Sequence, residues 1–85
     1  MKTFYGLMAE FETAEIPLEK VCLKYFSLDI KTAAERAGRA KLPVPAYRAG
    51  TQKSQWLVSA HALAEHLDER KKEAESDWRK RRNAA

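Results

Sequence analysis

The side chains best suited to chemistry in this sequence lie in "IKTAAERAGRA", residues 30–40. Residues three and four apart share a face of a helix, so one face would carry Thr32, Glu35, Arg36 and Arg39, with Lys31 at its flank. Arginine can donate two hydrogen bonds to guanine, and threonine can contact a phosphate or a thymine methyl group. Glu35 can accept from cytosine or pair with Arg39 at i+4. Taken alone, this pattern is explained better by an ordinary amphipathic surface helix; the turn before it and the hairpin after it favour recognition.

A second polar group follows in residues 48–55, "RAGTQKSQ". Its candidate contact residues are Arg48, Thr51, Gln52, Lys53 and Ser54. These side chains are small or flexible and can donate hydrogen bonds to phosphates or near a minor groove. A plain hairpin loop also favours Gly and Ser. The absence of any carboxylate from Leu42 to Ala64 favours a nucleic-acid contact.

Positive charge is concentrated in two blocks. The net charge is +4 over 85 residues. Residues 29–56 carry six basic and two acidic side chains, and residues 70–82 carry seven basic and three acidic ones. The second block ends in a basic tail formed by Arg79, Lys80, Arg81 and Arg82. Clustered positive charge is the electrostatic footprint of a nucleic-acid binder, although a solubilising face with a frayed tail would give the same charge.

Other kinds of site find little support in the sequence. His61 and His66 are five residues apart, about 140° around a helix, and cannot share a metal. No zinc-type spacing and no phosphate-binding glycine loop is present, and the single Cys22 fits a core position. We therefore expect no enzyme, no metal and no cofactor. The apolar runs are far shorter than the ~20 residues that cross a bilayer, so we expect a soluble, cytoplasmic protein with no membrane partner.

The elements that would position these groups begin with two helices. Residues 3–11 fit a helix capped by Thr3, although their alternation also fits a strand. Pro17 suits the first position of a second helix. The apolar face of that helix is Leu18, Val21, Cys22, Tyr25 and Phe26.

A three-residue break, "SLD", precedes the helix over residues 30–40. Asp29 is a good N-cap for this helix. Its inner face would be Ile30, Ala33, Ala34 and Ala37. The small side chains of this face would let the helix lie close to its partner helix.

Two strands and a long helix follow. Pro43 and Pro45 force "KLPVPAYR" into an extended edge strand, and "QWLVS" is a second strand. Ser59 would cap a final helix with an apolar stripe of Ala60, Leu63, Ala64, Leu67, Ala74 and Trp78. Trp56 would be a core residue or a prop for the loop, whereas Trp78 would pack against the amino-terminal helix or a second subunit.

This order predicts a mainly α fold with a small β-hairpin: a winged helix-turn-helix with a long C-terminal helix. Residues 1–85 would form a single domain, with a core over about 3–70 and a basic C-terminal helix or tail over 70–85. Residues 30–40 would be the recognition helix and residues 48–55 the wing.

Several segments resemble the pyocin activator PrtN family in their order along the chain. They are "LMAEF", "IPLEKVC", "YFSL", "LPVPAYR", "TQKS" and "ALAEHLDERK", and together they span about Thr3 to Glu73. The most distinctive are "IPLEKVC" and "QKS"; the remaining pattern is shared with small phage excisionases. The resemblance implies a DNA-binding activator of phage-derived genes in a bacterial cell, acting at repeated promoter boxes at the nucleoid. "AERAGRAK" departs from the family pattern, so the DNA sequence recognised need not be the same.

The predicted function is therefore sequence-specific binding of double-stranded DNA in transcription activation. RNA polymerase is a further candidate partner, and a homodimer through the C-terminal helix with Trp78 is the candidate assembly. Two alternatives stay open at this stage. One is an excisionase-like factor that bends DNA; the other is a small phage-encoded module that binds and inhibits a protein.

Overall fold

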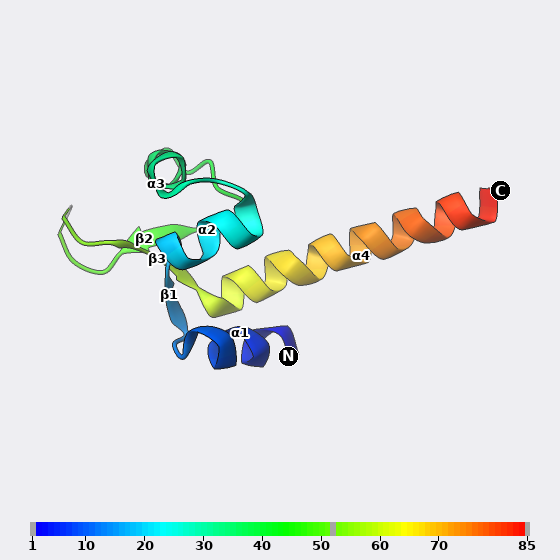
Figure 1. Cartoon of the computed structure of the whole chain (residues 1–85), viewed down its shortest axis with the longest axis horizontal. Helices are drawn as coiled ribbons and strands as arrows, with labels where there is room; N and C mark the ends of the chain where they lie inside the picture. Colours follow the sequence, from blue (N-terminus) through cyan, green and yellow to red (C-terminus); the bar gives the residue numbers. More distant parts are fainter. Residues whose placement is uncertain (1, 52, 85) are drawn as a thin grey trace.

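A computed structural model describes residues 2–51 and 53–84 of the chain and contains four helices and three strands over those residues (Figure 1). In chain order they are α1 (Lys2–Phe11), β1 (Glu15–Pro17), α2 (Leu18–Phe26), α3 (Ile30–Gly38), β2 (Ala46–Arg48), β3 (Trp56–Ser59) and α4 (Ala60–Ala84). The prediction of a mainly α fold with a small β-hairpin is confirmed. Residues 3–11 are helical, so the strand alternative for this segment is wrong.

The sheet has three antiparallel strands in the order β1-β3-β2, so the predicted hairpin β2–β3 gains a third strand. Ile16 pairs with Val58, and Ala46 pairs with the other side of Val58. β2 is an edge strand as predicted, but it contains only Ala46–Arg48, because the proline-rich segment before it stays irregular. Pro17 ends β1 rather than starting α2, which begins at Leu18.

The core lies between α2, the inner face of the sheet and the first turns of α4. Its largest fully buried side chains are Ile16, Leu18, Val21, Val58 and Leu63. Ser59 ends β3 and caps α4, since its Oγ accepts from the amides of His61 and Ala62 at 3.1 and 3.4 Å. The predictions of this cap and of a buried Cys22 are confirmed.

The connection between α2 and α3 is fixed by both helix ends. Ser27 adopts a left-handed conformation with φ of 56°. The Leu28 amide donates back to the Cys22 carbonyl at 3.1 Å, a common way to close a helix. Asp29, two residues after Ser27, caps α3: its side chain accepts a hydrogen bond from the Thr32 amide at 2.9 Å. The predicted cap is confirmed, and only three residues, 27–29, separate α2 from α3.

Substituting Asp29 tests this cap. Asp29→Ala is expected to lower the melting temperature, because the Thr32 amide loses its acceptor. Hydrogen bonds from the Thr32 side chain and amide hold the pKa of Asp29 below its ordinary value of 3.8. Because the pKa of Asp29 is lower in the folded state than in the unfolded state, its carboxylate stabilises the fold at pH values above the unfolded-state pKa. This contribution is lost as the pH falls through the lowered pKa of the folded state. Thermal unfolding of both proteins should therefore show a difference at neutral pH that shrinks in acid.

Asp29→Asn is the matched control, because asparagine keeps a capping oxygen without the charge. It should retain most of the neutral-pH stability. A difference between wild type and Asp29→Ala that stayed constant into strong acid would argue against a role for the carboxylate.

Two smaller predictions about the helices are wrong. Thr3 does not cap α1, which starts at Lys2; its hydroxyl donates instead to Asp68 Oδ1 at 2.6 Å and ties α1 to α4. Ile30 does not face the core: it is 46% exposed, whereas Ala33 is fully buried. As the first residue of α3, Ile30 lies where that helix leaves the turn rather than over the partner helix.

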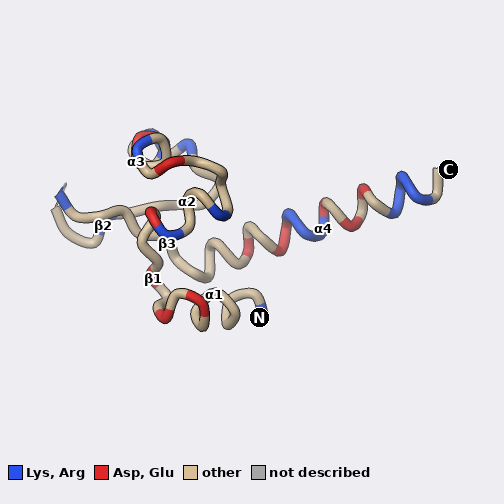
Figure 2. The backbone as a smooth tube through the Cα atoms, viewed as in Figure 1, with Lys and Arg blue, Asp and Glu red and all other residues tan. Residues whose placement is uncertain are grey.

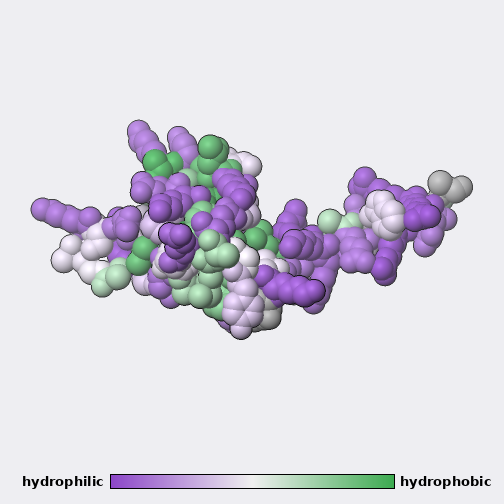
Figure 3. All heavy atoms as spheres, turned by 60° about the horizontal axis from the view of Figure 1, so that its bottom comes forward, coloured by the Kyte–Doolittle hydropathy of each residue, from purple (hydrophilic) through white to green (hydrophobic). Residues whose placement is uncertain are grey.

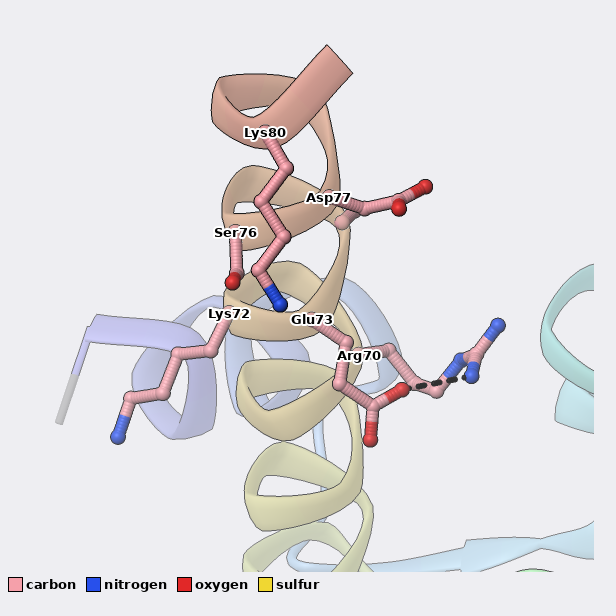
Figure 4. Close-up of a pocket in the computed structure, with 7 residues that line it drawn as sticks. Arg70, Lys72, Glu73, Ser76, Asp77 and Lys80 are labelled. Atoms are coloured by element: carbon pink, nitrogen blue, oxygen red, sulfur yellow. Dashed lines mark hydrogen bonds and ion pairs between the residues drawn. The ribbon is translucent and has the colours of Figure 1, made fainter. Parts of the chain in front are cut away.

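Only the first third of α4 packs on the rest of the protein. Ala60, Leu63 and Ala64 are buried, and residues 69–84 are exposed throughout. The helix therefore projects from the core, as Figure 1 shows, and its projecting half is almost wholly hydrophilic in Figure 3. Ion pairs three or four residues apart, such as Arg70–Glu73 at 2.9 Å, stabilise this half (Figure 4). Within residues 2–51 and 53–84, no helix is long and apolar enough to cross a membrane.

Candidate nucleic-acid interface

The outer face of α3 brings together the side chains predicted for base and phosphate contacts. Thr32, Glu35, Arg36 and Arg39 line one open surface depression of about 440 Å³. Arg39 Nη2 lies 3.4 Å from Oε1 of Glu35, four residues earlier, and both side chains are more than half exposed. Pairing of Glu35 with Arg39 is thus the arrangement present, and it orients the guanidinium along the helix surface. Lys31, also exposed, is the neighbour of Thr32 near the start of α3.

Lys41 extends this surface, although the sequence patterns did not single it out. α3 ends at Gly38, so residues 39 and 40 are not part of the helix. Ala40 takes a left-handed conformation with φ of 55°, and the Lys41 amide donates to the Arg36 carbonyl at 2.8 Å. This bond brings Lys41 back to line the same depression as Arg36. The sequence pattern does not place Lys41 on this surface, because the residue lies beyond the helix and begins the proline-rich segment.

The predicted wing is the loop between β2 and β3, and it projects from the sheet at the end opposite α4 (Figure 1). A turn forms its tip, with the Ser54 amide donating to the Thr51 carbonyl at 2.9 Å and the Lys53 amide donating to Thr51 Oγ1 at 3.3 Å. A Cβ at residue 50 would lie 2.7 Å from Ser54 Oγ, so a larger residue than Gly50 would require the Ser54 side chain to move. The predicted contact Gln52 lies outside the described residues.

The base of this loop is held by a stacked pair. The Arg48 guanidinium lies 4.5 Å from the centre of the Trp56 ring, across the β2–β3 pairing. Trp56 is half-buried and packs against the core. The structure therefore places Trp56 as a prop for the loop. Arg48 is partly committed to this stack, which leaves Thr51, Lys53 and Ser54 at the loop tip.

The basic tail is not brought together with α3 and the loop. Arg79, Lys80, Arg81 and Arg82 lie on the last turns of α4, at the far end of the molecule from the loop (Figures 1 and 2). Two of these arginines pair within the helix: Arg79 with Glu75 at 2.6 Å and Arg81 with Asp77 at 3.2 Å. Trp78 is 56% exposed, so the prediction that it packs against the amino-terminal helix is wrong.

Two further polar contacts link neighbouring elements of the fold. A hydrogen bond to Glu10 at 2.6 Å raises the pKa of Lys24 and links α1 to α2. A hydrogen bond donated to Glu15 raises the pKa of Tyr47 and crosses the outer face of the sheet from β2 to β1. The surface hollow of Figure 4 is lined by α4 alone and has no opposing wall, which makes it unsuited to enclose a small ligand. Among the described residues, no group of His, Cys, Asp or Glu could hold a metal ion.

Comparison with known protein families gives a match over most of the chain. The family model described as "Pyocin activator protein PrtN" matches residues 3–74. This range runs from the second residue of α1 through β3 to the first part of α4, and it leaves out the basic tail. No curated protein and no solved structure matches the chain.

Proposed function

The chain belongs to the pyocin activator protein PrtN family, and from this premise we propose that it activates transcription by binding specific sequences in double-stranded DNA. The family identifies a transcriptional activator of pyocin genes and favours a regulator over an enzyme. The finer proposal is the mode of binding: a winged helix-turn-helix, with α3 in the major groove and the β2–β3 loop as the wing. The protein would act in the bacterial cytoplasm at the nucleoid, on repeated promoter boxes and with RNA polymerase as a further partner.

The observation that carries this proposal is the surface formed by α3. A helix that follows α2 after three residues, with small residues inward and cationic groups outward, is the pattern expected of a recognition helix. Arg36, Arg39 and Lys41 line the same depression and give it a net positive charge beside the single carboxylate of Glu35. Thr32 adds a short group able to contact a phosphate or a thymine methyl group. We assign Lys31 and Lys41 to the flanking phosphates and the arginines to base edges.

The wing would hold the backbone or minor groove beside this site. Lys53, Thr51 and Ser54 lie at its tip, and no carboxylate occurs in the loop. Contacts of this kind position a protein on DNA without reading its sequence. Gln52 and Arg48 belong to the same proposal, as does a salt-sensitive contribution from the tail at residues 79–82 to neighbouring phosphates.

Lys53→Ala is expected to weaken binding by a similar factor for cognate and unrelated duplexes. A phosphate contact releases counterions, so its loss should reduce the slope of log K against log salt by about 1. Titrations of both duplexes at several salt concentrations measure this slope. Lys72→Ala, on the projecting half of α4, removes the same charge outside the wing and serves as the control. A loss confined to the cognate duplex would instead assign Lys53 to base reading.

The function as a whole is tested by selecting bound duplexes from a random pool and sequencing them. A recurrent motif, followed by activation of a reporter that carries it, is the expected result. Permuted-site gel shifts on the same motif measure any bend in the DNA. A strong bend without reporter activation would favour an excisionase-like factor, and failure to bind any duplex at low salt would overturn the proposal.

A further inference from the structure

Trp78 is the most unusual residue of the projecting half of α4. It is 56% exposed and is followed directly by the four basic residues 79–82. The Arg82 guanidinium lies 5.2 Å from the centre of its ring. Tryptophan and arginine are the residues most enriched at the energetic centres of protein interfaces. A tryptophan presented beside arginines on a bare helix is therefore a candidate anchor for another surface.

A hollow of matching chemistry lies elsewhere on the same molecule. Leu42–Ala46, Ala37 and Ala40 line an open depression of about 390 Å³, and these side chains are all apolar. Its wall at Pro43–Pro45 is shared with an adjoining groove along α4. That groove carries three carboxylates, Glu65, Asp68 and Glu69, with Lys72 at its far end. An apolar hollow beside an acidic edge suits an aromatic side chain next to basic ones.

The tail cannot reach this hollow in its own molecule. The acidic edge and the tail are parts of one continuous helix, α4, which spans Ala60–Ala84. Fifteen residues separate Glu65 from Lys80, and at 1.5 Å per residue they lie about 22 Å apart along the axis. Figure 1 shows that the helix points away from the rest of the protein without bending back. Any tail that fills the hollow must come from another molecule.

We propose that the α4 tail of one copy docks on the Leu42–Ala46 hollow and acidic edge of a second copy, with Trp78 as its anchor. In the arrangement proposed, the contact is head-to-tail: the tail of one copy fills the hollow of the next, and no reciprocal contact closes the pair. Each bound copy leaves its own tail free for the next, which allows short chains of molecules. The contact would place the basic residues 79–82 beside the carboxylates of Glu65, Asp68 and Glu69. Salt screens such attractions, so the contact is salt-sensitive.

Two variants separate the two sides of this contact. Trp78→Ala removes the anchor from the tail, and Glu65→Lys/Glu69→Lys reverses the charge of the acidic edge; all three residues are solvent-facing. Sedimentation velocity at low salt should show concentration-dependent association of the wild type, weakened roughly tenfold or more in each variant alone. Circular dichroism confirms that both variants remain folded.

Mixing the two variants is the decisive measurement. The Trp78→Ala protein keeps an intact hollow and the Glu65→Lys/Glu69→Lys protein keeps an intact tail, so the equimolar mixture should form 1:1 dimers that do not grow further. A reciprocal two-fold pair would also give 1:1 dimers in this mixture, but its wild type would stop at the dimer, and that result would overturn the head-to-tail arrangement. A wild type that stays monomeric at every concentration, or a mixture that stays monomeric, would overturn the proposal. Both readouts are made without DNA, so this proposal and the proposed DNA binding can fail independently.

Discussion

Arg36→Ala is expected to weaken binding to the cognate duplex by about 1–3 kcal/mol, roughly fivefold to 150-fold, and to relax the base preference at one position. Arg36 lies on the exposed face of α3 and lines the same depression as Thr32, Arg39 and Lys41. Within residues 2–51 and 53–84, no ion pair engages its guanidinium, whereas Arg39 pairs with Glu35. Its donors are thus available for a guanine edge, where a two-hydrogen-bond contact supplies this discrimination.

The measurement is a set of titrations against the selected duplex and single-base variants of it. The affinity lost on Arg36→Ala should be large for the duplex that carries the preferred base. It should be small for the duplex in which that base is already changed. Arg70→Ala is the control, because Arg70 is an exposed arginine on the projecting half of α4 and its loss changes the net charge equally. Equal losses for Arg36→Ala and Arg70→Ala would reduce the role of Arg36 to general electrostatics. An unchanged cognate affinity in both Arg36→Ala and Arg39→Ala would show that α3 is not the recognition helix.

The local signals of the sequence predicted the segments that position α3. Asp29 was readable as a cap because its side chain acts within three residues, and the face of α2 follows directly from the helical period. The two prolines before β2 indicated an edge strand, since they cannot donate to a neighbouring strand. These features depend on residues close together in the chain, which is why pattern reasoning reaches them.

The features missed depend on partners far away in the chain. β1 has only three residues, and its pairing with β3 joins Ile16 to Val58. No local pattern distinguishes such a strand from a loop before a helix, especially when it ends in Pro17. The apolar stripe predicted for α4 does lie on one face of the helix. Its last two members, Ala74 and Trp78, lie beyond the point where the core ends and are exposed. Periodicity shows which residues share a face, and only the tertiary structure shows whether anything covers that face.

For the candidate site, helical spacing predicted which residues of α3 share a surface, and the structure added Lys41 to that group. Thr32, Glu35, Arg36 and Arg39 share a surface as their spacing requires. Lys41 joins them through a turn at Ala40 that has no signal in the helical pattern. The prediction of a separate basic tail at residues 79–82 rests on charge alone, and charge carries no information on position. Their place at the far end of α4 is what allows a role in contacts between copies.

Leu63→Ala is expected to have the largest effect on stability, about 2–5 kcal/mol. Leu63 is fully buried, and it is the one large side chain of α4 among the fully buried residues of the core cluster, which also contains Val58 and Leu18. Removing three of its carbons leaves a cavity that a well-packed core closes only partly. Small domains are stable by only about 5–15 kcal/mol, so the variant should lose a large part of its stability.

Urea unfolding followed by helical circular dichroism measures this loss. Leu23→Ala is the matched control, because Leu23 on α2 is 72% exposed and the same substitution there should change the stability by less than about 0.5 kcal/mol. The two substitutions remove the same atoms and differ only in burial. The difference between their free energies of unfolding therefore reports the packing of α4. If Leu63→Ala and Leu23→Ala unfolded at similar urea concentrations, α4 would not be docked on the core as described. The position of the projecting tail, and with it the head-to-tail contact, would then have to be abandoned.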